Sequence, residues 1–315
     1  MASSSSVPES GNLNQQVAQQ QQVQPERAAY LISGSTMKLK EHQLKIQVEN
    51  PVDFKSLTFH GCDFQEFYAA QGWLQYFNLL NGPTYKALVR HFWVRASIFD
   101  KKAAEEEEKN LVLLYPKLAG KTREELYLEP FTGTEIRSSV MGVPIQIIAS
   151  VLSVKAEGIY SGIEIPNPHT SSWKDTVNMT LFNSTKGGKY SDFDMQKKML
   201  LKIQFENLLP KGGGSDQPSL AHKVFIHHII HGEKVNLPRY IFKYMVKELW
   251  KSQNEDRFWV LYRRLLCEIF HQGGIIKALS QTRFYTDQML ETVVGKVING
   301  KTLKNMQLIK VLLFI

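Results

Sequence analysis

Apolar residues recur every three or four positions along two neighbouring stretches of the chain, which predicts two amphipathic helices. The first covers about residues 64–80 and ends at Asn81-Gly82-Pro83, because glycine accepts a left-handed cap and proline cannot continue a helix. The second carries one aromatic-rich stripe, made of Tyr85, Leu88, Val89, Phe92, Trp93, Ala96 and Phe99. We expect the two helices to pack as an antiparallel hairpin whose stripe forms protein core and no cofactor site.

The same periodicity returns in the second half of the chain, where capping residues mark the expected helix starts. Helices are expected from Ser171 or Ser172 to Leu181, from Ser191 or Asp192 to Leu209, from Ser215 or Asp216 with Pro218 in the first turn, from Asn236, and over residues 258–270, 287–298 and 301–313. The second half is therefore predicted to be almost entirely helical.

The whole pattern predicts a mainly α, multi-helix globular domain with at most a minor β element. Alternating apolar residues within 37–48 predict an edge strand. Residues 1–34 are rich in Ser, Gln and Pro and poor in large apolar side chains. They cannot bury enough surface to offset the entropy of ordering, so we expect a disordered N-terminal arm. The domain then covers residues 35–315.

The middle of the chain is less regular. Thr132 and Glu135 have capping-box spacing, so residues 128–144 are expected to form a turn and a short helix that stops at a glycine and a proline. Residues 145–154 are apolar and partly β-branched, a pattern that fits a helix or a strand. The glycine- and proline-containing loop at 158–170 is expected to divide two subdomains.

Charge and cysteine content narrow the class of protein. The 315-residue chain has a formal net charge of +8, and residues 181–315 carry the excess, with 21 Lys and Arg against 11 Asp and Glu. A basic half is typical of proteins with polyanionic partners. Two cysteines make no disulfide framework, and neither a secretory signal nor a membrane-length apolar run is evident. We expect an intracellular protein without a membrane anchor, in the nucleus or the cytoplasm.

Histidines offer the strongest hint of a metal site. Four of them crowd one predicted helix, where His227 and His231 lie four residues apart on one face. Cys267 and His271 have the same spacing on another helix, and such pairs can share a zinc ion. The two helices would have to face each other. Since the histidine helix is apolar almost all round, core histidines bonded to carbonyl groups are the favoured interpretation, and we expect no metal and no other cofactor.

Basic residues offer a second candidate site. The predicted nucleic-acid contacts are Arg239, Lys243, Lys247 and Lys251, which recur every four residues beside Tyr240, Tyr244 and Trp250, together with Arg263 and Arg264. A cationic stripe with aromatic neighbours can follow a phosphate backbone. The alternative is an ordinary solvated helix face.

Catalytic patterns are weak by comparison. The four adjacent glutamates at 105–108 point around a whole helix and are expected to be solvated. The glycines at 212–214 lack the Gly-Lys-Ser/Thr ending of a phosphate-binding loop. We identify no catalytic constellation in the sequence.

Several segments together resemble the plant transposon protein domain family, whose legume members are called retroelement envelope-like proteins. They are residues 72–96, 121–125, 131–144, 212–220, 235–241 and 298–303, with Asn81-Gly82-Pro83-Thr84-Tyr85 and Val235-Asn236-Leu237-Pro238-Arg239 among their motifs. The resemblance covers residues 50–305 and implies a retroelement lineage without established catalytic residues. The apolar end at 311–315 then suggests a truncated copy. The implied function is a non-enzymatic structural or interaction protein with protein or nucleic-acid partners, and the alternative is a nucleic-acid-binding module.

Overall fold

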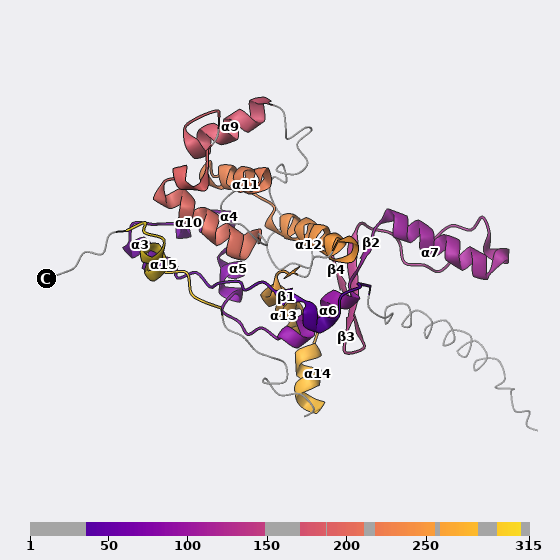
Figure 1. Cartoon of the computed structure of the whole chain (residues 1–315). Coiled ribbons are helices and arrows are strands. Elements are labelled where there is room, and N and C mark those ends of the chain that lie inside the picture. Colours follow the sequence, from indigo (N-terminus) through magenta and orange to yellow (C-terminus); the bar gives the residue numbers. More distant parts are fainter. Residues whose placement is uncertain are drawn as a thin grey trace, which may run out of the picture.

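The computed structural model describes residues 36–148, 171–186, 188–210, 218–255, 259–282 and 295–309. These residues are mainly helical, as expected (Figure 1). The helices are α3 (Phe54–Phe59), α4 (Gln65–Gln71), α5 (Leu74–Leu79), α6 (Lys86–Arg95), α7 (Lys101–Leu114), α9 (Ser171–Phe182), α10 (Met195–Ile203), α11 (Leu220–Ile230), α12 (Leu237–Asn254), α13 (Arg263–Gln272), α14 (Ile275–Thr282) and α15 (Gly300–Asn305). A π helix, Gln204–Leu208, continues α10. The predicted arm at 1–34 and the predicted boundary at 158–170 lie outside the described residues.

The β structure of the described residues forms two small sheets. β2 (Ser97–Phe99), β3 (Glu135–Val140) and β4 (Val143–Ile147) make an antiparallel sheet in that order. β1 (Lys45–Ile46) pairs in parallel with β5 (Trp259–Val260). The strand expected within residues 37–48 is thus confirmed at two residues, and its partner comes from the far end of the domain.

The short helix expected within residues 128–144 is wrong, because this segment forms the β3–β4 hairpin. Met141 and Gly142 make the connection with φ values of 51° and 80°. Two residues with positive φ match the right-handed twist of a tight hairpin. Ile136 is buried in β3, where β-branched side chains pack well. The undecided segment from residue 145 begins as a strand, and residues 149–154 lie outside the described part.

The single helix expected over residues 64–80 is two helices. α4 ends at Gly72, whose φ of 79° provides a left-handed cap. α5 begins after Trp73, which is fully buried and stacks on Phe225 of α11 with ring centroids 5.6 Å apart. The break therefore turns the largest side chain of the segment toward a helix that lies far away in sequence.

The aromatic stripe of α6 is buried, as predicted. Phe92 and Trp93 are at most 1% exposed, and the Phe92 ring lies 5.8 Å from that of Phe270. α13 packs against both α5 and α6. α6 ends at Arg95 and does not continue to Phe99, because residues 97–99 pair with β3.

Local capping explains where the helices of the second half begin. Asn236 caps α12 as expected, its Oδ1 accepting from the Arg239 amide at 3.1 Å. Asp194 caps α10, in place of the predicted Ser191 or Asp192. The start predicted at 215–216 lies outside the described residues.

The last helices also differ from the sequence prediction. The helix expected from residue 258 starts later, at Arg263, because residues 259–260 pair with β1 and Tyr262 has a left-handed φ of 54°. Of the helix expected over residues 287–298, the described part, residues 295–298, is not helical. The helix expected from residue 301 is α15, which ends at Asn305.

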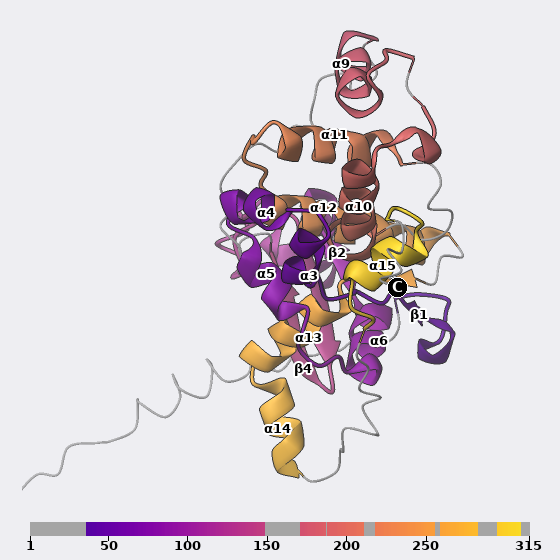
Figure 2. The same cartoon turned by 90° about the vertical axis from the view of Figure 1, so that its left-hand side faces the viewer.

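The elements form a layered helical body (Figures 1 and 2). α11 packs against α9, α10 and α4, and α12 contacts β2. α7 extends away from this body, as does α14 in a different direction. Among the described helices, none combines the length and the apolar character that crossing a bilayer requires.

Candidate functional site

One long face of α12 is exposed and basic. The exposed residues between positions 239 and 254 are Arg239, Lys243, Lys247, Trp250 and Asn254. Steps of three and four residues place them on one side of the helix. The opposite side is anchored in the core by fully buried residues such as Tyr240, Met245 and Leu249. We call the exposed set the α12 face.

Lys251, a predicted member of the basic stripe, and Tyr244, predicted beside it, contact other partners. The Lys251 ammonium is 2.7 Å from the Glu248 carboxylate, and its side chain is 19% exposed. The Tyr244 hydroxyl donates to the Pro210 carbonyl at 2.7 Å. Glu248 is itself 8% exposed, so the α12 face carries no exposed carboxylate from position 239 to 254.

Arg263 and Arg264 do not belong to this face, and their prediction as nucleic-acid contacts is wrong. Both are 1% exposed at the start of α13. The Arg264 Nη1 donates to the Gly82 carbonyl at 2.8 Å, and the Arg264 amide donates to Glu49 Oε2 at 2.9 Å. Arginines are rarely buried to this degree without a carboxylate, and that carboxylate lies 215 positions away in the sequence.

Glu49 is fully buried beside the two arginines. Burial raises the pKa of its carboxyl to about 7, although the Arg264 amide and both guanidinium charges act to lower it. Burial also lowers the pKa of both arginines. Within the described residues, Glu49 Oε1, all three Arg263 guanidinium nitrogens, and Nε and Nη2 of Arg264 have no hydrogen-bond partner. The cluster therefore has more donors than acceptors.

The π helix accepts hydrogen bonds from buried tyrosines on one side and from Asn50, next to Glu49, on its outer side. A π turn is a local irregularity often associated with functional sites. The buried hydroxyls of Tyr76 and Tyr262 donate to carbonyls of this segment at 2.7 and 2.9 Å. On the outer side, Asn50 donates its side-chain amide to Glu206 Oε2 at 2.8 Å. Residues from distant parts of the chain thus meet at Gln204–Leu208.

His222 of α11 is buried and bonds to a carbonyl, as the favoured interpretation predicted, whereas the buried His228 pairs with the Glu233 carboxylate. His222 Nε2 is 3.0 Å from the Leu209 carbonyl, and His231 Nδ1 is 2.8 Å from the His227 carbonyl. His227 Nδ1 contacts the Thr180 hydroxyl at 2.8 Å. Burial and the neighbouring histidines lower the pKa of His227 to about 4, so its ring is neutral near pH 7.

The four candidate metal ligands are not brought together. The ring of His227 on α11 and that of His231, which follows the helix, are 4.2 Å apart, but no third His, Cys, Asp or Glu among the described residues completes a metal-binding group with them. Cys267 lies on α13, and its Sγ accepts a hydrogen bond from the Tyr85 amide at 3.2 Å. Burial raises the pKa of this thiol to about 12. His271 is exposed in the last turn of α13.

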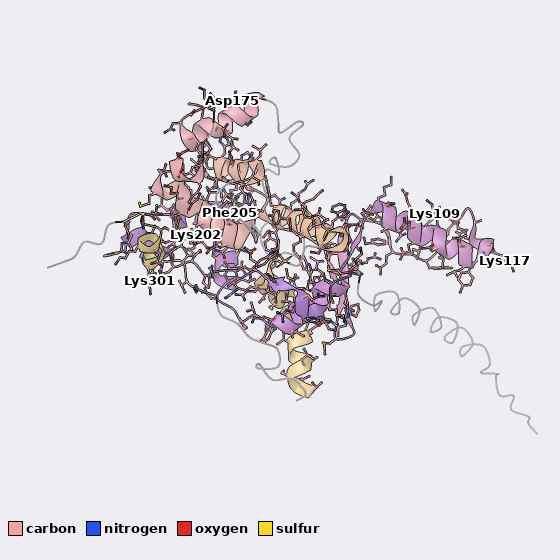
Figure 3. The ribbon with its side chains drawn as sticks, in the orientation of Figure 1. Lys109, Lys117, Asp175, Lys202, Phe205 and Lys301 are labelled. Carbon is pink, nitrogen blue, oxygen red and sulfur yellow. The ribbon has the colours of Figure 1, made fainter. Side chains whose placement is uncertain are left out.

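The α7 arm carries the acidic run of residues 105–108. It is partly solvated, as predicted, but Glu107 and Glu108 also bind Arg123 of the returning segment at 2.6 and 3.1 Å. The far end of the arm exposes apolar residues: Leu113, Leu114, Tyr115 and Tyr127 are each at least half exposed. Figure 3 shows Lys109 and Lys117 along this projecting arm.

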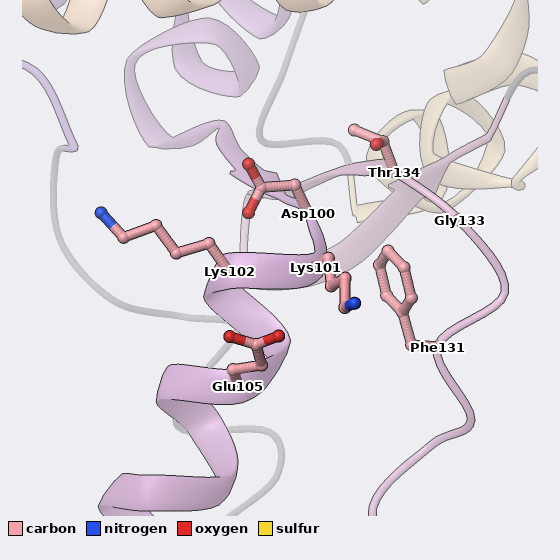
Figure 4. Close-up of a pocket in the computed structure, with 7 residues that line it drawn as sticks. All are labelled: Asp100, Lys101, Lys102, Glu105, Phe131, Gly133 and Thr134. Atoms are coloured by element: carbon pink, nitrogen blue, oxygen red, sulfur yellow. The ribbon is translucent and has the colours of Figure 1, made fainter.

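Surface hollows lie at the root of α7 and between the π helix and α15. One, of about 590 Å³, is at the root of α7, where Lys101 and Lys102 are balanced by Asp100 and Glu105 (Figure 4). The Asp100 carboxylate is already used, since it caps α7 through the Ala103 amide at 3.0 Å. The other, of about 580 Å³, lies between the π helix and α15.

Sequence reasoning missed Glu49 and the residues of the second hollow. Glu49 is a lone carboxylate between a short strand and a proline, and nothing local indicates its burial. Lys202 and Glu206 do carry a signal, because opposite charges four residues apart on a helix pair with each other. The contribution of residues 295–301 follows only from tertiary packing.

Comparison of the chain with known protein families, curated proteins and solved structures finds no match. The functional argument therefore rests on the residues and geometry of this chain.

Proposed function

We propose that this chain is a non-enzymatic interaction protein of retroelement lineage that binds nucleic acid through the α12 face. The observation that carries the proposal is the composition of this face: Arg239, Lys243 and Lys247 are exposed in line, and the one acidic residue between positions 239 and 254, Glu248, is buried. The lineage and the non-enzymatic character rest on the resemblance of residues 50–305 to the plant transposon protein domain family.

Spacing and charge suit a phosphate backbone. Four residues of α-helix rise about 6 Å, so the three cations form a straight row at that interval. Each phosphate that such a row neutralises releases condensed counterions, which makes binding favourable at low salt. The excess of basic residues in 181–315 raises the attraction at longer range.

Trp250 favours a single-stranded partner. It is 53% exposed and continues the row of cations toward the end of α12. An exposed indole can stack on an unpaired base, an interaction worth about 1–3 kcal/mol per base. In an intact duplex the bases are already stacked on one another.

Charge reversal on the α12 face tests the proposal. The triple variant R239E/K243E/K247E should lose binding to single-stranded DNA and RNA at low salt. The matched control K234E/K277E/K304E changes the net charge equally at exposed lysines outside α12 and should retain most binding. Equal losses in the two variants would show that only net charge matters and would exclude the α12 face as the site.

The non-enzymatic part has its own test. The purified chain, incubated with Mg²⁺ or Mn²⁺ and DNA, should leave the strands intact. Strand cleavage or transfer that disappears with one point substitution of an acidic residue would contradict it.

A further inference from the structure

The hollow between the π helix and α15 is strongly basic. It is lined by Asn50, Lys202, Glu206, Lys296, Lys301 and Thr302, with apolar residues at 297, 298 and 306. Lys202 lies at the end of α10, and Lys301 lies on α15 (Figure 3). Three lysines therefore surround one glutamate in a volume of about 580 Å³, which is within the range of small-molecule sites.

The single carboxylate of this hollow is already engaged. Glu206 forms an ion pair with Lys202 and accepts from the Asn50 side-chain amide at 2.8 Å. Lys296 and Lys301 are exposed, and no ion pair within the described residues neutralises either one. The net positive potential of the hollow is therefore concentrated on the side formed by Lys296 and Lys301.

A second layer of positive charge lies directly behind the wall. At Gly295, next to Lys296, a methyl group in place of the α-hydrogen would approach the Glu49 carbonyl to 2.2 Å and both Arg264 Nη2 and Asn50 Oδ1 to 3.2 Å. Only a glycine fits there, so the segment is packed tightly against the buried cluster. Arg264 Nη2 and Asn50 Oδ1 are both buried without a hydrogen-bond partner in the described part of the chain.

Surface lysines above buried positive charge are an arrangement that suits an anion. Two buried arginines face one buried glutamate, and low-dielectric surroundings screen their surplus charge weakly. Of the two arginines, Arg264 approaches Gly295, next to Lys296, so its charge adds to the positive potential on that side of the hollow. Lysine ammonium groups at the surface then supply charge-assisted hydrogen bonds to an anion.

We propose that this hollow binds the phosphate group of a small phosphomonoester, with Lys296 and Lys301 as direct ligands and the buried Arg264 as background charge behind Lys296. A phosphate dianion matches the lysine surplus. The apolar side, formed by Val297, Ile298 and Met306, gives room for the organic part of the molecule. None of the residues that line the hollow lies in α12.

The test is calorimetric titration of the full chain with inorganic phosphate and with AMP, against sodium chloride at matched ionic strength. Saturable binding of AMP, tighter than that of inorganic phosphate, is expected. Replacing Lys301 by Met should weaken AMP binding about tenfold, the effect of one charge-assisted hydrogen bond. Lys296→Met should act similarly. Lys304→Met, on the same helix but outside the hollow, should leave the affinity unchanged.

Three outcomes would overturn the proposal. They are no heat beyond that of sodium chloride, equal weakening by Lys304→Met and Lys301→Met, or loss of AMP binding in R239E/K243E/K247E. That triple variant also separates this proposal from the nucleic-acid proposal, since it should abolish DNA binding and leave AMP binding intact.

Discussion

At the scale of single residues, the buried Glu49 carboxyl should make the stability of the protein depend on pH. Its pKa is about 7 in the folded state and 4.5 ordinarily, so folding takes up a proton between these values. Stability from this group is full below about pH 4.5, falls as pH rises to about 7, and changes by about 3 kcal/mol in all. In Glu49→Gln, the free energy of unfolding measured with urea should no longer fall between pH 4.5 and 7. The exposed control Glu124→Gln should keep this downward slope; an unchanged slope in Glu49→Gln would refute the assignment.

His227 should contribute a slope of the opposite sign. Its folded pKa of about 4 lies below the ordinary value of 6.5, so the unfolded chain binds the extra proton. Stability from this group is present above pH 6.5 and is lost as pH falls toward 4. His227→Asn should therefore lose less stability than the wild type on acidification. Replacing the exposed His42 by Asn should have no such effect, and equal behaviour of the two variants would argue against a buried neutral His227.

At the scale of elements, Gly72 fixes the break between α4 and α5. Its φ is 79°, and nothing lies within 4 Å of the position a Cβ would take. Gly72→Ala should therefore destabilise the protein through backbone conformation alone, by about 1–2 kcal/mol. Chemical unfolding measures this loss. Unchanged stability would mean that α4 and α5 can join into one helix, as the apolar periodicity alone predicted.

Arg123 should hold the α7 arm to its returning segment. It binds Glu107 and Glu108 and contacts the Ala104 carbonyl at 3.3 Å. We expect Arg123→Met to raise amide hydrogen exchange throughout residues 101–114, while global stability changes little because the arm lies outside the core. Lys117→Met, on the same arm, is the control. Unaltered exchange in α7 would show that helix propensity alone maintains it.

These elements also show which structural information is local. The stripe of α6 and the cap of α12 depend on residues within a few positions, and the sequence predicted both. The β3–β4 hairpin was missed because Thr132 and Glu135 imitate a capping box, whereas the deciding signal is a two-residue turn with positive φ. β1 pairs with β5, which lies more than 200 positions away in the sequence, and no local sequence pattern predicts such a pairing.

At the scale of the whole molecule, the same distinction divides the candidate sites. The α12 face was predictable in part: four-residue spacing placed Arg239, Lys243 and Lys247 together, but Lys251, the fourth residue of that row, pairs with Glu248. Arg263 and Arg264 were predicted at the surface and are buried, since their environment depends on Glu49. The basic hollow joins segments around residues 50, 202 and 300, which only tertiary structure brings together.

The most direct test of the central claim is the salt dependence of single-stranded nucleic-acid binding. If Arg239, Lys243 and Lys247 contact phosphates, replacing all three by Gln should make the slope of log Kd against log salt shallower by about 2, at roughly 0.7 per contact. The control K234Q/K277Q/K304Q should keep the wild-type slope. Identical slopes in the wild type and the α12 variant would contradict the assignment of this face as the nucleic-acid site.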